Sequence, residues 1–156
     1  MPDRLFISFL TMCLVAACMY SCHKESEYDK VKKVVLNVQK ATEEKDIRVI
    51  LDSISKTYRD PQGNAYDDIK GLVLAYFYRY QKISLYIPSI EVAVENSSAK
   101  AAFQAIMTGR GAHDPSTAVL PESIDAYAFD VSLKKEPGGW KIVAAKWERI
   151  GDMAVR

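Results

Sequence analysis

Asp60 is the residue of this sequence with the clearest capacity for chemistry. It lies in the segment Tyr58-Arg59-Asp60-Pro61-Gln62-Gly63-Asn64. A carboxylate at the mouth of a pocket can shuttle a proton if its pKa suits the task. The alternative role is structural, because an Asp followed by Pro and Gly commonly bonds to the backbone of its own turn. We favour the structural role, in which backbone N–H groups lower the pKa of Asp60.

Most other site chemistries lack the residues they need. The chain has two histidines and three cysteines, and no cysteine follows Cys22. Cysteine-based zinc sites and thiol nucleophiles are therefore excluded from the domain, and a lone His113 does not make a metal site or a Ser/His/Asp triad. No glycine-rich phosphate loop occurs. With 21 Lys+Arg against 20 Asp+Glu, nothing indicates a nucleic-acid partner. We expect neither a metal nor a cofactor.

The N-terminal residues predict export and a lipid anchor. The apolar run from Leu5 to Ala17 is shorter than the roughly 20 residues that a membrane-spanning helix needs, and it is typical of a signal peptide over residues 1–17. The alternative is a buried N-terminal strand or helix. Val15-Ala16-Ala17-Cys18 resembles the lipobox of bacterial lipoproteins, which implies acylation of Cys18 with palmitate-type chains; Cys22 is a poorer second candidate. Residues 18–28 would then be a tether to the cell envelope, at the outer membrane facing the periplasm if the host has two membranes.

Helical spacing follows in the next part of the chain. Val31, Val34, Val35, Val38 and Ala41 share one helix face, with Ser26 and Asp29 as a capping pair. Asp46 can cap a second, shorter helix. Asp67 and Asp68 open a third, whose apolar stripe is Ile69, Leu72, Val73, Tyr76, Phe77 and Tyr80. We expect Tyr76, Phe77 and Tyr80 to point inward.

Beyond about residue 84 the period changes to two. Alternation predicts strands over 90–95, 99–108, 127–134 and 140–150, with turns at 96–98 and 136–139 and a long loop over 109–122. Helices followed by antiparallel strands define an α+β domain over residues 29–156, with the helices packed on one face of the sheet.

Several of these features together resemble the nuclear transport factor 2-like superfamily, which includes ketosteroid isomerases and SnoaL-like polyketide cyclases. They are Lys45-Asp46, Asp60-Pro61-Gln62-Gly63, the aromatic third helix, Gly139-Trp140-Lys141-Ile142-Val143 and Trp147. The resemblance implies a cone in which a strongly curved sheet wraps three helices around an apolar pocket.

In ketosteroid isomerases the acid that matches Asp60 is the general base, and a Tyr and a protonated Asp form the oxyanion hole. The Tyr position falls near Val38, and the second acid has no secure counterpart, although Asp125 and Asp130 are near. Only one of three catalytic parts is therefore matched.

Three functions remain open. The first is a lipoprotein that binds a small apolar or amphipathic ligand without catalysis, with Tyr58, Tyr76 and Tyr80 as candidate lining. The second is an isomerase, cyclase or dehydratase that uses Asp60 as its base. The third is an interaction module that forms a homodimer through the open face of the sheet, as members of the resembled superfamily often do.

Overall fold

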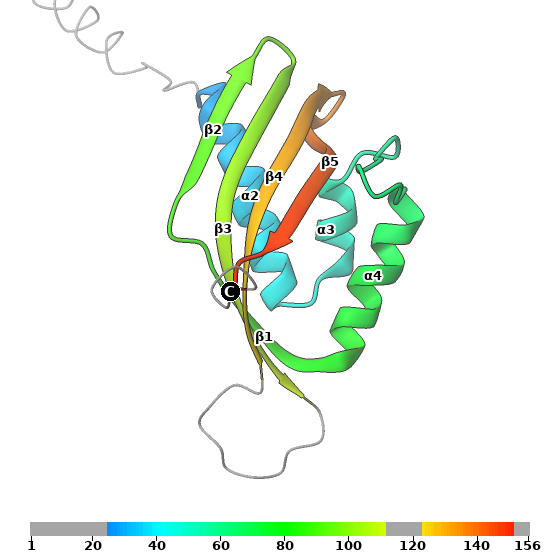
Figure 1. Cartoon of the computed structure of the whole chain (residues 1–156). Helices are drawn as coiled ribbons and strands as arrows, with labels where there is room; N and C mark the ends of the chain where they lie inside the picture. Colours follow the sequence, from blue (N-terminus) through cyan, green and yellow to red (C-terminus); the bar gives the residue numbers. More distant parts are fainter. Residues whose placement is uncertain (1–24, 112–122, 152–156) are drawn as a thin grey trace, which may run out of the picture.

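The computed structural model describes residues 25–111 and 123–151. The predicted signal peptide, Cys18, Cys22 and His113 lie outside these residues. The described helices come first and the strands second, which confirms the predicted α+β order (Figure 1). In chain order the elements are α2 (Glu27–Glu43), α3 (Ile47–Ser53), α4 (Tyr66–Arg79), β1 (Tyr80–Tyr86), β2 (Ile90–Glu95), β3 (Ser98–Gly111), β4 (Ser123–Glu136) and β5 (Gly139–Arg149).

Each helix begins where a side chain satisfies otherwise unpaired backbone N–H groups. The Ser26 hydroxyl accepts a hydrogen bond from the Asp29 N–H at 3.1 Å, and Asp46 accepts one from the Arg48 N–H at 3.0 Å. At α4 the Asp68 carboxylate accepts from the Ala65 N–H at 2.8 Å. Helix α2 starts at Glu27, so Glu27 and Tyr28, the last two residues assigned by sequence to the tether, belong to the folded domain.

The sheet is antiparallel, with strand order β1-β3-β4-β5, and β2 pairs with β3 as well. Strand β3 is long enough to hold two partners end to end: its first half pairs with β2 and its second half with β1. The sequence did not predict β1, and residues 109–111, assigned to a loop, extend β3 instead. A register shift between Tyr80 and Lys82 interrupts the alternation that would have revealed β1.

The sheet curves around the helices, which cover one of its faces (Figure 1). A second register shift lies between β4 and β5, where Val143 is an extra residue opposite Ser132 and Leu133. Such bulges bend a strand and increase its twist. The curvature expected of a cone is therefore built into the strand pairing.

The segment between α3 and α4 runs along β5. The Ser55 N–H donates to the Ile142 carbonyl at 2.8 Å, and the Arg59 N–H donates to the Val143 carbonyl at 3.0 Å. Ile54 and Ile142 form a parallel bridge at the same place. These bonds carry the chain from α3 past the bulge and hold it against the sheet edge.

The most tightly packed part of the core lies between the first half of α2 and the β2–β3 end of the sheet. Val31, Ala101 and Leu133 are at most 1% exposed there, and Trp140 is also buried. None of the helices that the structure describes combines the length and the apolar character needed to cross a membrane.

Candidate functional site

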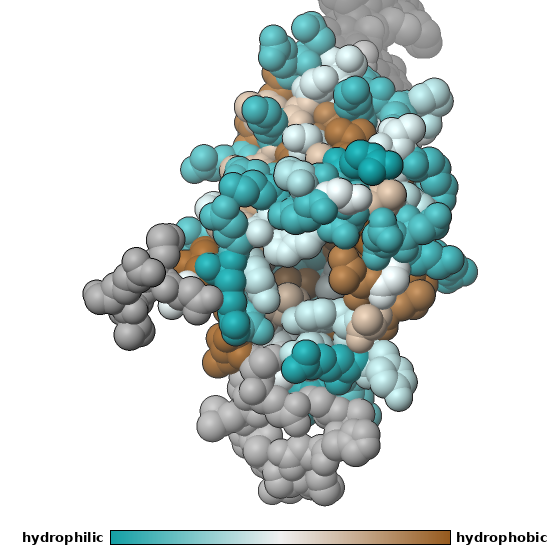
Figure 2. Space-filling view, turned by 45° about the vertical axis from the view of Figure 1, so that its right-hand side comes forward, coloured by the Kyte–Doolittle hydropathy of each residue, from teal (hydrophilic) through white to brown (hydrophobic). Residues whose placement is uncertain are grey.

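A cavity of about 370 Å³ lies between the three helices and the inner face of the sheet. Ligand pockets in proteins commonly hold about 300–1,000 Å³, so this volume suits a small molecule. Figure 2 shows a hollow in this part of the surface, bordered by hydrophobic side chains. The described residues that line the cavity carry no charge. They include Val38, Thr42, Ile50, Tyr58, Leu72, Tyr76, Phe77, Leu85, Phe103, Met107, Tyr127, Phe129, Val131 and Trp147.

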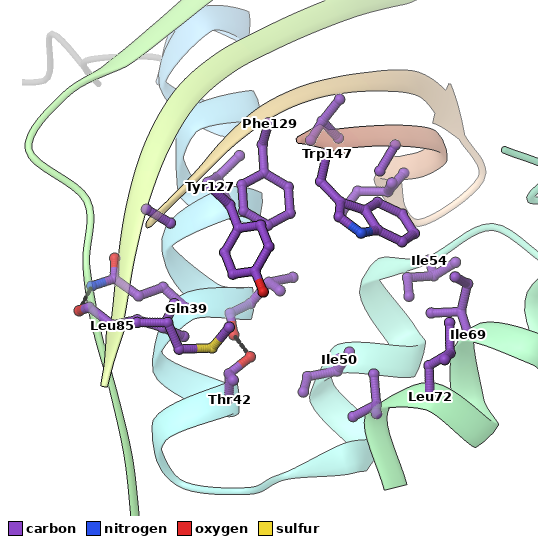
Figure 3. A pocket seen from close by; sticks show the side chains of 18 of the residues that line it. Gln39, Thr42, Ile50, Ile54, Ile69, Leu72, Leu85, Tyr127, Phe129 and Trp147 are labelled. Atoms are coloured by element: carbon purple, nitrogen blue, oxygen red, sulfur yellow. Dashed lines mark hydrogen bonds between the residues drawn. The ribbon is translucent and has the colours of Figure 1, made fainter. Parts of the chain in front are cut away.

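Strand pairing places an aromatic wall along the sheet side of the cavity. Phe103 on β3 faces Phe129 on β4, and their rings stack with centroids 5.2 Å apart and planes 14° from parallel. Tyr127 lies one step further along β4, with its ring 6.2 Å from that of Phe129. Trp147 on β5 pairs across from Phe129 and completes the wall (Figure 3). Aromatic side chains in this arrangement offer flat, apolar surface.

The polar groups of the cavity are few, and those on α2 already have partners. The Gln39 side-chain N–H donates to the Leu85 carbonyl at 2.9 Å, and the Thr42 hydroxyl donates to the Val38 carbonyl at 2.7 Å. The Tyr127 hydroxyl points toward Thr42 in Figure 3 and has no hydrogen-bond partner among residues 25–111 and 123–151.

Tyr58, a candidate from the sequence, lines the cavity from the segment between α3 and α4 that runs along β5. It is buried, and its hydroxyl lies 3.4 Å from an Asp60 carboxylate oxygen. Burial, together with the negative charge of Asp60, raises the pKa of Tyr58 to about 12. Tyr58 is therefore a neutral phenol over the physiological pH range.

Asp60 is buried behind Tyr58 and is not part of the cavity lining. Its carboxylate accepts hydrogen bonds from the backbone N–H and the side-chain amide of Asn64, both at 2.8 Å. Burial by itself would raise the pKa of Asp60, but the bonds from Asn64, from the Gln62 backbone and from Tyr58 bring it below its ordinary value. The geometry is that of a carboxylate that holds its own turn together.

Tyr76 and Tyr80, the two tyrosines predicted on the apolar stripe of the third helix, differ in their relation to the cavity. Tyr76 lines the cavity, and burial together with its neighbour Tyr80 raises the pKa of Tyr76 to about 12. Tyr80, the other tyrosine predicted from that helix, is not among the residues that line the cavity. It is the first residue of β1, its ring lies 4.9 Å from that of Tyr76, and it fills the space left by the missing side chain of Gly109.

Sequence reasoning missed the aromatic wall, although its signal was present. Tyr127, Phe129 and Val131 alternate along a strand that was predicted, and Phe103 and Met107 alternate along another. What the sequence lacked was the register, which brings Phe103, Phe129 and Trp147 side by side.

No family model and no curated protein matches this sequence. Several solved structures, however, are similar to it. One is a protein of the nuclear transport factor 2-like family from Streptomyces avermitilis, provisionally named a dehydratase. Its TM-score with this chain is 0.71 at 10% sequence identity, and the match covers 82% of this chain and 99% of that chain. Another, from Novosphingobium aromaticivorans and provisionally named a scytalone dehydratase, has TM-score 0.67 and 13% identity over 81% of this chain and 87% of that one. This chain has the nuclear transport factor 2-like fold.

A further structure with the same likeness, Bd1075 of Bdellovibrio bacteriovorus, has TM-score 0.66 and 14% identity over 83% of this chain. The present chain spans only 44% of the length of that protein. At these identities the comparisons establish the nuclear transport factor 2-like fold, and the residues of the cavity have to be judged by their own chemistry.

Judged in this way, the catalytic parts of a ketosteroid isomerase do not assemble in this nuclear transport factor 2-like domain. Val38 lines the cavity and supplies no donor. Asp130 is exposed and pairs across the sheet with Lys146. Asp125 forms an ion pair with Arg149. Over the ranges that the structure describes, no group of three potential metal-ligating side chains occurs either.

Proposed function

We propose that this protein is a cell-envelope lipoprotein whose cavity binds a small apolar or amphipathic molecule without catalysing a reaction. The observation that carries the proposal is the uncharged cavity of about 370 Å³, from which the one acid singled out by sequence is absent. An apolar cavity with a few placed polar groups is the usual form of a small-molecule site. Proton transfer near neutral pH would need a group of matching pKa inside the cavity, and burial raises the pKa of Tyr58 and Tyr76 to about 12.

Native mass spectrometry of residues 18–156 with Cys18→Ser tests ligand binding directly. We expect a species heavier than the bare chain by the mass of a small molecule. Met107→Trp replaces a flexible thioether side chain of the lining with a large indole ring that fills part of the cavity. This variant should lose the heavier species while circular dichroism shows that the chain stays folded. A bare chain after mild purification, combined with turnover that Asp60→Asn abolishes without unfolding, would support the catalytic alternative.

The anchor is a separate part of the proposal and has its own test. Val15-Ala16-Ala17-Cys18 supports acylation at Cys18, and stable anchoring takes more than one acyl chain. Cys18→Ser should remove labelling by a palmitate analogue and release the protein from the membrane fraction, whereas Cys22→Ser should do neither. In a host with two membranes we expect the outer membrane, with the domain facing the periplasm. Persistent labelling of Cys18→Ser would move the site to another residue.

A second candidate function, homodimerisation, is favoured by one surface. Tyr86, Ile106 and Ile124 are 63%, 40% and 66% exposed, and Tyr86 pairs with Ile106 across β1 and β3. Side chains at these positions point away from the helices, on the face of the sheet opposite to the cavity. Sedimentation of the wild type should then show a concentration-dependent dimer, which Ile106→Glu prevents and Lys100→Glu, on the same face, does not.

A further inference from the structure

Two polar side-chain groups of the cavity lining make no hydrogen bond within residues 25–111 and 123–151: the Tyr127 hydroxyl and the Trp147 indole N–H. Gln39, Thr42 and Tyr58 direct their donors to Leu85, Val38 and Asp60 respectively. The remaining hydroxyl of the lining, on Tyr76, lies against Tyr80. A phenolic O–H is both donor and acceptor, and it usually finds a partner when it is removed from water.

The charges nearest to Tyr127 compensate each other. Asp125 lies two residues before it on β4 and is largely buried, with a side chain 12% exposed. Arg149 lies directly opposite Tyr127 on β5 and forms an ion pair with Asp125. The charges next to Tyr127 are therefore paired with each other, and the described residues that line the cavity carry no charge. An ionised ligand would lose its hydration without gaining an unpaired counter-ion.

The shape of the wall adds a preference for flat molecules. The Phe103 and Phe129 rings are nearly parallel, and Trp147 lies across from Phe129 on the neighbouring strand, so a planar ring can lie against aromatic side chains of the sheet. At roughly 30 Å³ for each water, 370 Å³ corresponds to about a dozen waters. Two fused rings with one short substituent would fill such a volume without protruding through the mouth.

We propose that the cavity selects neutral, planar aromatic molecules that carry one hydrogen-bond acceptor, and that the Tyr127 hydroxyl donates to that acceptor. This inference rests on the proposed ligand-binding function and names its substrate class. Tyr127 acts here as a specificity-determining residue: the aromatic wall supplies most of the contact area, and the hydroxyl distinguishes a ketone or similar group from a bare hydrocarbon. The Asp125–Arg149 pair discriminates against acids by leaving them without a counter-ion.

Isothermal titration with four two-ring probes tests each element of the inference. Residues 18–156 with Cys18→Ser would be titrated with 2-acetonaphthone, naphthalene, 2-naphthoate and trans-decalin. We expect the ketone to bind most tightly, the carboxylate at least tenfold more weakly, and decalin several-fold more weakly than naphthalene. Tyr127→Phe should weaken the ketone about three- to tenfold, the range expected for one neutral hydrogen bond, and leave naphthalene unchanged.

Tyr86→Phe is the matched control, because it removes the same hydroxyl from the opposite face of the sheet. Thermal melts establish that each variant is folded. Equal affinity for the carboxylate and the ketone, or an equal loss for ketone and naphthalene in Tyr127→Phe, would overturn the inference while leaving a ligand-binding protein. If no probe binds but native mass spectrometry still shows a bound molecule, the substrate class is wrong and the binding function stands. Failure in both measurements removes the two proposals together.

Discussion

The two ends of the domain are built from the same elements and differ in what the elements enclose. Near the start of α2, Val31 is completely buried and contacts the core; two turns later, Val38 lines the cavity. Along β4, Leu133 is 1% exposed, whereas Tyr127 lies beside empty volume. The inward-facing periodicity is unbroken in both elements. An apolar stripe therefore specifies a face, and the spacing of the neighbouring elements decides whether that face becomes core or cavity.

Different contacts fix the two ends. At the closed end Glu27 accepts hydrogen bonds from the Trp140 indole N–H at 2.8 Å and from Lys135 at 2.9 Å, which draws α2 onto the β4–β5 hairpin. At the cavity end the Lys45 ammonium donates to the Phe77 carbonyl at 2.9 Å and to the Tyr80 carbonyl. Lys45, just after α2, thus ties the end of α2 to the end of α4 and to the first residue of β1. Helix α4 forms one side of the cavity, and Ile69 is the only residue of this helix that is buried.

The largest difference between the ends should appear with matched leucine truncations. Leu133→Ala at the closed end should lower the free energy of unfolding by about 2–5 kcal/mol, because it opens a new void in packed core. Leu85→Ala should cost less than half as much, since Leu85 already borders the cavity. Urea denaturation of both variants measures the difference. Equal losses would mean that the cavity end is packed as tightly as the core.

Gly109 offers a way to disturb the cavity end from within the sheet. A Cβ at this position would lie 2.4 Å from the Tyr80 ring, so Gly109→Ala forces that ring to move against Tyr76. We expect a loss of about 1–3 kcal/mol in unfolding free energy, the usual range for overpacking. Thermal denaturation provides the measurement, with Gly71→Ala as the control because nothing lies within 4 Å of its added methyl group. If both variants melt alike, the contact is not a constraint.

Asp60 tests whether the segment beside the cavity is structural or functional. Asp60→Ala should cost about 0.5–2 kcal/mol of stability, the scale of a lost cap, because Asn64 loses two bonds to the carboxylate. Ligand affinity should remain nearly unchanged. The hydrogen-bonded carboxylate also has a lowered pKa, so the stability it contributes is present above its unfolded pKa of about 3.9 and is lost on acidification. An apparent pKa well above 3.9 in an NMR titration would contradict the structural role.

The smallest effect is expected at Glu27, and it depends on pH. Hydrogen bonds from Lys30, Lys135 and Trp140 lower the pKa of Glu27 from 4.5 to about 2. Stabilisation by a carboxylate with a lowered pKa is complete above 4.5 and disappears as the pH falls toward 2. Glu27→Gln should therefore lower the melting temperature slightly at pH 7 and much less at pH 2, where about half of the Glu27 carboxylates are protonated. A difference that stays undiminished at pH 2 would assign the effect to packing of the Trp140 ring instead.

Local signals explain why the helices could be predicted. Ser26 and Asp46 cap helices where the sequence placed them, since a cap depends on residues only two or three positions away. Strand β1 was missed because its partner is the distant second half of β3 and because its register shift hides the alternation. Tyr80 was misplaced for the same reason. It stands four residues after Tyr76, which continues a helix stripe, but pairing with Gly111 ends the helix first.

The candidate site was less accessible to sequence than the fold. The tyrosines near α4 and Asp60 attracted attention through residue type, and Tyr58 and Tyr76 do reach the cavity. The wall that faces them depends on pairing between residues that are distant in the sequence: Phe103 with Phe129, 26 positions apart, and Phe129 with Trp147, 18 positions apart. The residue types within one strand do not determine which residues of the neighbouring strand they pair with.

The hydrogen bonds between the segment after α3 and β5 also bear on how this protein avoids polymerising. An uncovered edge strand can recruit another chain, edge to edge, into a growing sheet. Here Ser55 and Arg59 occupy the Ile142 and Val143 carbonyls, and the bulge at Val143 breaks the flat template. Further along the same strand the outward positions carry Lys146 and Glu148, an ion pair that an incoming strand would have to disrupt. The segment between α3 and α4, which positions Tyr58, thus also covers part of the β5 edge and hinders its pairing with another chain. Variants made in this segment to alter binding should therefore be checked for solubility.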